Sequence, residues 1–200
     1  MINPNFVILG AVIALAGTSR YVLDTLEGKT RPNRVSWFMW TLAPMIAFAA
    51  EIHQGVGVRS LATFMAGFCP LLVLIASFVN RKSVWKLTKF DLTCGILSMI
   101  GLILWQITGQ GNVAIFFSIM ADGLAALPTV AKSYHSPESE TWAGFFASGI
   151  SAGIALLTIR NWTFANYGFP LYLMIICLLL TLLIKFELGP RLVARRVYDS

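Results

Sequence analysis

The sequence predicts an all-α membrane protein that crosses the bilayer with seven helices. Three observations lead to this fold class. Hydrophobic residues make up 57% of the 200-residue chain and charged residues only 12%, about half the charged fraction of a typical soluble domain. The apolar residues lie in seven continuous stretches separated by short polar connections. The basic residues gather at alternate connections, as the positive-inside rule describes for a multi-pass protein.

A helix needs about 20 apolar residues to cross the hydrocarbon core of a bilayer. The expected spans are 6–23, 35–50, 60–80, 90–108, 113–131, 141–159 and 163–186. The break between the fourth and fifth spans falls at 108–112, which contains two glycines and no apolar residue. The connections are too short to form a soluble domain.

The basic residues also predict the orientation. Thirteen Lys and Arg residues lie at the connections after the first, third and fifth spans and in the C-terminal tail, whereas only Arg59 and Arg160 lie on the other side. This bias predicts that the N-terminus lies outside and the C-terminus in the cytoplasm. The basic residues fall on one side of the membrane only if the chain crosses it seven times. The net charge of +6 therefore indicates orientation rather than nucleic-acid binding.

Several other classes of protein are disfavoured. Cys69, Cys94 and Cys177 are odd in number and lie inside apolar runs, so a disulfide scaffold is not expected. His53 and His135 fall in opposite connections and are not expected to share a metal. The chain carries no recognisable catalytic or phosphate-binding motif. We expect no enzyme activity, no metal and no cofactor.

Weak internal repeats divide the chain into two three-helix units. The matches are Pro32 with Pro137, Ser36 with Thr141 and Trp37 with Trp142 at an offset of 105 residues, Thr25 with Thr129 at 104, and Pro70 with Pro170 at 100. The first unit is 1–80, a basic segment and linker helix follow at 81–111, the second unit is 112–186, and 187–200 is a cytoplasmic tail. One helix between units of three gives them the same orientation, so the expected arrangement is a 3+1+3 parallel repeat.

This layout resembles the PQ-loop superfamily, which includes the SWEET sugar carriers and lysosomal amino-acid exporters; the vitamin-uptake PnuC carriers are similar in layout. The family signature corresponds here to 126–134, which contains Pro128, whereas the first unit has Asp24 at the proline position. Neither unit has the Pro-Gln dipeptide. The resemblance implies a small-solute carrier working by alternating access, with or without proton coupling. It also implies hinge roles, for Pro128 by motif position and for Pro44, Pro70 and Pro170 by analogy.

Asp122 is the leading candidate site residue, because it is a charged residue in the middle of a predicted span. A carboxylate at that depth costs about 3 kcal/mol or more unless it is paired, hydrated or protonated. Asp122 is expected to contact the solute or carry a coupling proton. The alternative is a structural acid bonded to a hydroxyl or indole on a neighbouring helix.

Three further residues are expected to line the solute path. Trp40 lies one turn deeper than the interfacial Trp37 and could stack on a sugar or base. Asn166 loosely matches the asparagine that SWEET-like carriers place on the third helix of a unit. Ser148 lies on the sixth span near Gly149, which with Gly153 forms a GxxxG motif for close helix packing.

The inner end of the first span contains Arg20 and Asp24, four residues apart, which can pair on one helix face. They form either an inner gate or a simple helix-end ion pair. Gly10 and Gly17 on the same span are expected to permit close helix approach.

These observations together predict a multi-pass carrier of the cell (plasma or inner) membrane for a small polar solute. Membrane lipid and the solute are the expected partners, and the chain acts as a monomer or a homo-oligomer. The alternative is a non-transporting seven-helix sensor or receptor-like membrane protein.

Overall fold

The computed structural model describes residues 2–53, 58, 60–80, 83, 85–108 and 111–192. Within these ranges the secondary structure is helical and no β-strand occurs, which confirms the all-α class. The helices are α1 (Phe6–Leu26), α2 (Arg34–His53), α3 (Ser60–Val79), α4 (Lys89–Thr108), α5 (Gly111–His135), the 3₁₀ turn η2 (Pro137–Ser139), α6 (Trp142–Leu157) and α7 (Phe164–Lys185).

Each of the seven predicted apolar stretches coincides with one of the helices α1–α7. Most ends agree within three residues of the expected bounds. The main difference is α5, which continues to His135, four residues past its expected end. The extension includes Lys132, which is buried inside the protein.

Within the part of the chain that the structure describes, four helical segments are long and apolar enough to cross a membrane: Phe6–Leu26, Ser60–Val79, Ile115–His135 and Asn166–Lys185. The outer surface of the bundle carries many large apolar side chains; Ile107, for example, is 75% exposed and Val79 67% exposed. Soluble monomers rarely expose large contiguous apolar patches. The composition of the helices and of the surface both indicate a membrane protein.

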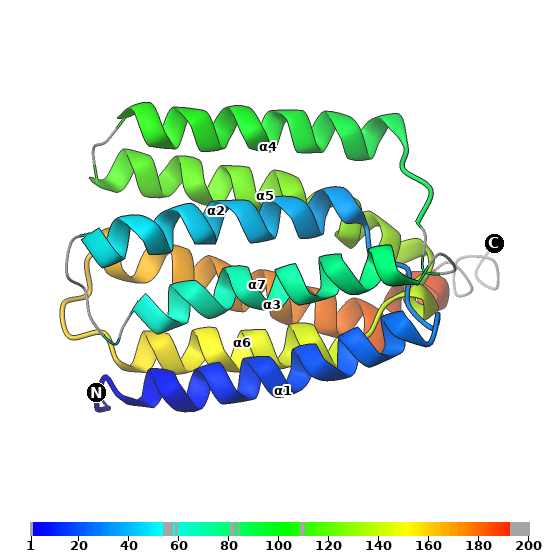
Figure 1. The fold of residues 1–200 in the computed structure, drawn as a ribbon, viewed down its shortest axis with the longest axis horizontal. Helices are drawn as coiled ribbons and strands as arrows, with labels where there is room; N and C mark the ends of the chain where they lie inside the picture. Colours follow the sequence, from blue (N-terminus) through cyan, green and yellow to red (C-terminus); the bar gives the residue numbers. More distant parts are fainter. Residues whose placement is uncertain are drawn as a thin grey trace.

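The helices lie side by side along one long axis, with the start of α1 at one end of the bundle and the end of α7 at the other (Figure 1). Helix α3 packs against both α1 and α2, and α7 packs against both α5 and α6. The main contacts between these groups are α1 with α6 and α2 with α5, while α4 packs on α5 and α2 at one edge. The first three helices and the last three therefore meet mainly along α1–α6 and α2–α5.

The contact between α1 and α6 is made by small residues. A Cβ atom at Gly17 would lie 2.3 Å from Ala147 Cβ and 2.8 Å from the Ala143 carbonyl oxygen. At Gly10 the nearest atom would be Ser151 Oγ at 3.0 Å. The backbones can approach this closely only because side chains are missing at these positions, the packing role expected of both glycines.

Near this contact, the bundle has an aromatic core. Tyr21, Trp37 and Phe145 are buried together with Val73, Leu180 and Ile184. The Tyr21 and Trp37 rings lie 4.9 Å apart, and Trp37 lies 5.9 Å from Phe145. The three rings come from α1, α2 and α6, so the aromatic core joins the first two helices to the sixth.

Candidate functional site

Asp122 lies on α5 and is 8% exposed. The Tyr172 hydroxyl on α7 donates a hydrogen bond of 2.7 Å to Asp122 Oδ2. The indole of Trp40 on α2 also interacts with this carboxylate. Two side-chain donors from two other helices therefore converge on one buried acid, which lowers the cost of desolvating it.

The two aromatic residues beside Asp122 pack against further aromatic rings. The Trp40 ring packs edge-on against Trp37 at 5.3 Å and against Phe145 at 6.2 Å. The Tyr172 ring packs against Phe169 at 6.0 Å. Buried indole and phenol groups combine an apolar face with one polar atom, so they suit a site that contacts both the carbon skeleton and the polar groups of a small molecule.

The structure thus brings together two of the four predicted residues, Asp122 and Trp40. Asn166 is exposed at the start of α7, where its amide donates to the Asn161 carbonyl oxygen at 2.7 Å. Ser148 is half-buried on α6. Tyr172 was not a predicted site residue, because a tyrosine in an apolar helix gives no sign from sequence that it faces an acid 50 residues away.

The four predicted hinge prolines all lie inside helices: Pro44 in α2, Pro70 in α3, Pro128 in α5 and Pro170 in α7. Each lacks the backbone N–H that would complete the helical ladder one turn earlier. Pro128 is buried and follows Asp122 by six residues on the same helix. The position of each proline is therefore suited to local bending of the helix that carries it.

A second polar cluster closes the basic end of the bundle. Arg20 Nη2 lies 3.1 Å from Asp24 Oδ1, the expected ion pair on one face of α1. Asp24 also accepts a 2.7 Å hydrogen bond from the Thr141 hydroxyl. Because Thr141 immediately precedes α6, this bond ties the end of α1 to the start of α6.

Beside it lies a buried ion pair between Lys132 of α5 and Glu140. The Nζ···Oε1 distance is 2.7 Å, and the two side chains are 1% and 0% exposed. The Tyr21 hydroxyl donates to the other oxygen of Glu140, and Lys132 also donates to the Arg31 carbonyl oxygen. From the sequence, Lys132 was predicted only to be a basic residue on the cytoplasmic side. Its partner Glu140 lies beyond a turn, and the two residues meet only in the folded chain.

Other bonds fasten the connections at this end. Asn80 donates to the Leu26 carbonyl oxygen at 2.7 Å, and Ser83 donates to that of Thr25. The Asn33 amide donates to Asp91 Oδ1 at 3.0 Å. The basic end is therefore a continuous hydrogen-bonded layer over the aromatic core.

Neither of two surface pockets, of about 460 and 290 Å³, includes Asp122, Trp40, Asn166 or Ser148 in its lining. Among the described residues, no group of three or more histidine, cysteine or acidic side chains is placed to hold a metal ion. The three cysteines are free and buried.

Comparisons with known proteins found no match to a protein-family model, to a curated protein or to a solved structure.

Proposed function

We propose that the chain is a seven-helix carrier of the SWEET/PQ-loop type that moves a small polar solute across the cell membrane by alternating access. In this proposal α1–α3 and α5–α7 are parallel repeats, α4 links them, and the N-terminus lies outside. The pattern of helix neighbours supports the repeat. Helix α3 contacts α1 and α2 as α7 contacts α5 and α6, and the α1–α6 contact corresponds to the α5–α2 contact.

The observation that carries the proposal is the bonding of Asp122 across the boundary between the two units. Asp122 and Tyr172 belong to the second unit, whereas Trp40 belongs to the first. A solute or proton that displaces Trp40 from Asp122 would weaken the contact of α2 with α5. Binding at this acid would then change the contact between the units, as alternating access requires.

The layer at the basic end supplies the cytoplasmic gate in this scheme. Arg20, Asp24 and Thr141 join α1 to α6 on that side of the aromatic core. Opening toward the cytoplasm would separate these residues, and bending at Pro128 would let the inner part of α5 move. Proton coupling would follow if Asp122 exchanged a proton in each cycle.

The test is solute uptake by proteoliposomes that contain the full chain, with radiolabelled glucose and alanine as neutral and zwitterionic probes. We expect uptake above that of empty liposomes for one probe, and we expect Asp122→Asn to reduce it by about tenfold or more, since one lost charge-assisted contact corresponds to at least ~1.4 kcal/mol. Tyr172→Phe, which removes one donor to Asp122, is expected to reduce uptake less.

Glu27→Gln is the matched control, because Glu27 is an exposed acid that bonds to Lys29 outside the Asp122 cluster. Its uptake should equal that of the natural chain. If Asp122→Asn also transported normally, Asp122 would have no role in transport. Saturable binding of a probe without uptake would instead support the sensor alternative.

A further inference from the structure

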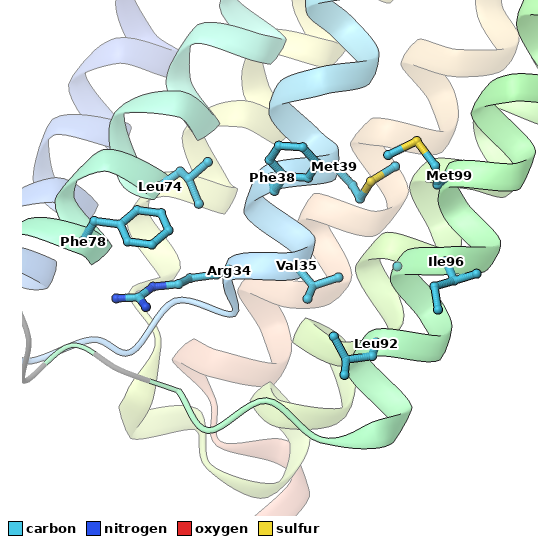
Figure 2. A pocket seen from close by; sticks show the side chains of 10 residues that line it. Arg34, Val35, Phe38, Met39, Leu74, Phe78, Leu92, Ile96 and Met99 are labelled. Carbon is cyan, nitrogen blue, oxygen red and sulfur yellow. The ribbon is translucent and has the colours of Figure 1, made fainter.

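The larger pocket is a groove between α2, α3 and α4, with a volume of about 460 Å³. Its walls are apolar and include Val35 and Phe38 of α2, Leu74 of α3 and Ile96 of α4. Figure 2 shows Arg34 at one end of this groove, below Phe78, with the apolar side chains extending away from it. Arg34 is the one charged residue in the lining.

The guanidinium of Arg34 is held in place from one side. Nε donates to the Ser77 hydroxyl at 3.3 Å, Nη2 donates to the Ser77 carbonyl oxygen, and the group lies 4.2 Å from the centre of the Phe78 ring. A guanidinium has five N–H donors, so within the described part of the chain three remain for another acceptor. No carboxylate lines the groove to neutralise the charge.

More positive charge stands beside this end of the groove. The Asn33–Asp91 hydrogen bond of 3.0 Å fastens the start of α4 to the start of α2. Lys86 and Lys89 lie just before Asp91 in the chain, and both are exposed. Asp91 is an acid at this end, but it is 3% exposed and bonded to Asn33, and the basic side chains of Arg34, Lys86 and Lys89 outnumber it. The mouth of the groove therefore carries a net positive charge, while its interior is apolar.

The groove has the depth of part of one leaflet. Its lining runs from Leu92 to Met99 on α4, which is about 10 Å at a rise of ~1.5 Å per residue. The hydrocarbon core of a whole bilayer is about 30 Å thick. Phe38, Leu92 and Ile96 are 47%, 51% and 63% exposed, so the groove opens sideways to the surrounding membrane.

We propose that this groove binds an anionic phospholipid, with the phosphate at Arg34 and an acyl chain along Phe38, Leu74 and Ile96. Charge complementarity favours this occupant, because basic pockets between membrane helices suit anionic head groups and a guanidinium matches a phosphate in shape. A second copy docked groove to groove would instead bring two Arg34 side chains together, and the groove lining contains no acid to pair with them, which is unfavourable. The assignment to the cytoplasmic leaflet rests on the proposed orientation; the lipid site itself does not depend on transport.

The test is thermal unfolding of the purified full chain in a neutral detergent with added phosphatidylglycerol or phosphatidylcholine of identical acyl chains. Phosphatidylglycerol is expected to raise Tm by about 5 °C when it is present well above its Kd. Phosphatidylcholine should raise Tm much less, because its positively charged choline group repels a second basic side chain at the mouth of the groove. Glycerol phosphate, which has the anion without acyl chains, should leave Tm unchanged.

Two variants and one control separate the lipid site from general charge effects. Arg34→Ala should lose the phosphatidylglycerol shift, whereas Arg191→Ala, which removes an exposed basic residue outside the groove lining, should keep it. Because Arg34→Ala also breaks the bonds to Ser77, Ile96→Trp provides a second variant that fills the groove and leaves Arg34 intact. It should also lose the shift.

The proposal is overturned if the two lipids give equal shifts, if glycerol phosphate reproduces the effect, or if Ile96→Trp keeps the full shift. Absence of any shift, with cross-linking between copies through Ile96→Cys, would assign the groove to a dimer contact instead. None of these readouts depends on uptake, so the lipid site and the carrier can fail separately.

Discussion

Glu140→Gln is expected to reduce the free energy of unfolding by about 3–5 kcal/mol, the usual effect of removing one partner of a buried ion pair. The substitution keeps the shape of the side chain and removes its charge. Lys132 is then left 2.7 Å from a neutral amide with no other acid bonded to it among the described residues. Reversible unfolding in mixed micelles, followed by circular dichroism, measures the change.

The exposed pair Glu27–Lys29 provides the control. Its two charges lie in water, where Lys29 lowers the pKa of Glu27 through a hydrogen bond and its charge, and exposed pairs contribute little to stability. Glu27→Gln should therefore unfold like the natural chain. Equal stability of Glu140→Gln and Glu27→Gln would show that the buried pair does not hold this end of the bundle together.

A double variant distinguishes the loss of an attraction from the cost of an unpaired charge. Lys132→Met combined with Glu140→Leu removes both charges and keeps apolar volume. Replacing a complete buried pair in this way is often neutral for stability. We expect the double variant to be more stable than Glu140→Gln, although Tyr21 then lacks its acceptor.

Gly17→Ala is the second substitution with a large expected effect. The new methyl group would lie 2.3 Å from Ala147 Cβ and 2.8 Å from the Ala143 carbonyl oxygen, and neither atom can move without its helix. Overpacking of this kind typically costs about 1–3 kcal/mol. The same micelle unfolding experiment should show the loss, and α1 and α6 must separate to relieve it.

Gly153→Ala is the matched control, because Gly153 lies on α6 where this helix packs against α7. The nearest atom to its added methyl group would be Met174 Sδ at 3.6 Å, an ordinary contact with a flexible side chain. This variant should be close to the natural chain in stability. Ala147→Gly introduced into Gly17→Ala should restore part of the loss; no restoration would mean that the two positions do not contact each other.

The sequence was sufficient to predict the helices because each one is a continuous apolar run, and such runs need no knowledge of their neighbours. The position of Asp122 was also predictable, since a charge inside an apolar run stands out. Its neighbours are a hydroxyl and an indole on other helices, as expected for the alternative of a structural acid. The uptake experiment therefore decides between a structural role and a role in transport. Of its partners, Trp40 was a candidate and Tyr172 was not.

The inner cluster could not be predicted, because its partners meet only through tertiary structure. Lys132 and Glu140 are eight residues apart, with η2 between them, and no helical spacing rule pairs residues across a turn. Their burial depends on Tyr21, which is 119 residues from Glu140 in the chain. A basic residue near the end of an apolar helix is ordinarily an interfacial residue, and this expectation placed the end of α5 too early.

The contact of α1 with α6 has a consequence for biosynthesis. At an elongation rate of about 5–20 residues per second, the ribosome needs on the order of ten seconds to travel the 119 residues from Tyr21 to Glu140. During that interval the glycine face of α1 has no partner and the Tyr21 hydroxyl has no acceptor. The nascent first helix therefore has α3 as a neighbour but lacks its α6 contact until α6 is synthesised. A chain that stalls before α6 would present this incomplete helix surface to membrane quality control.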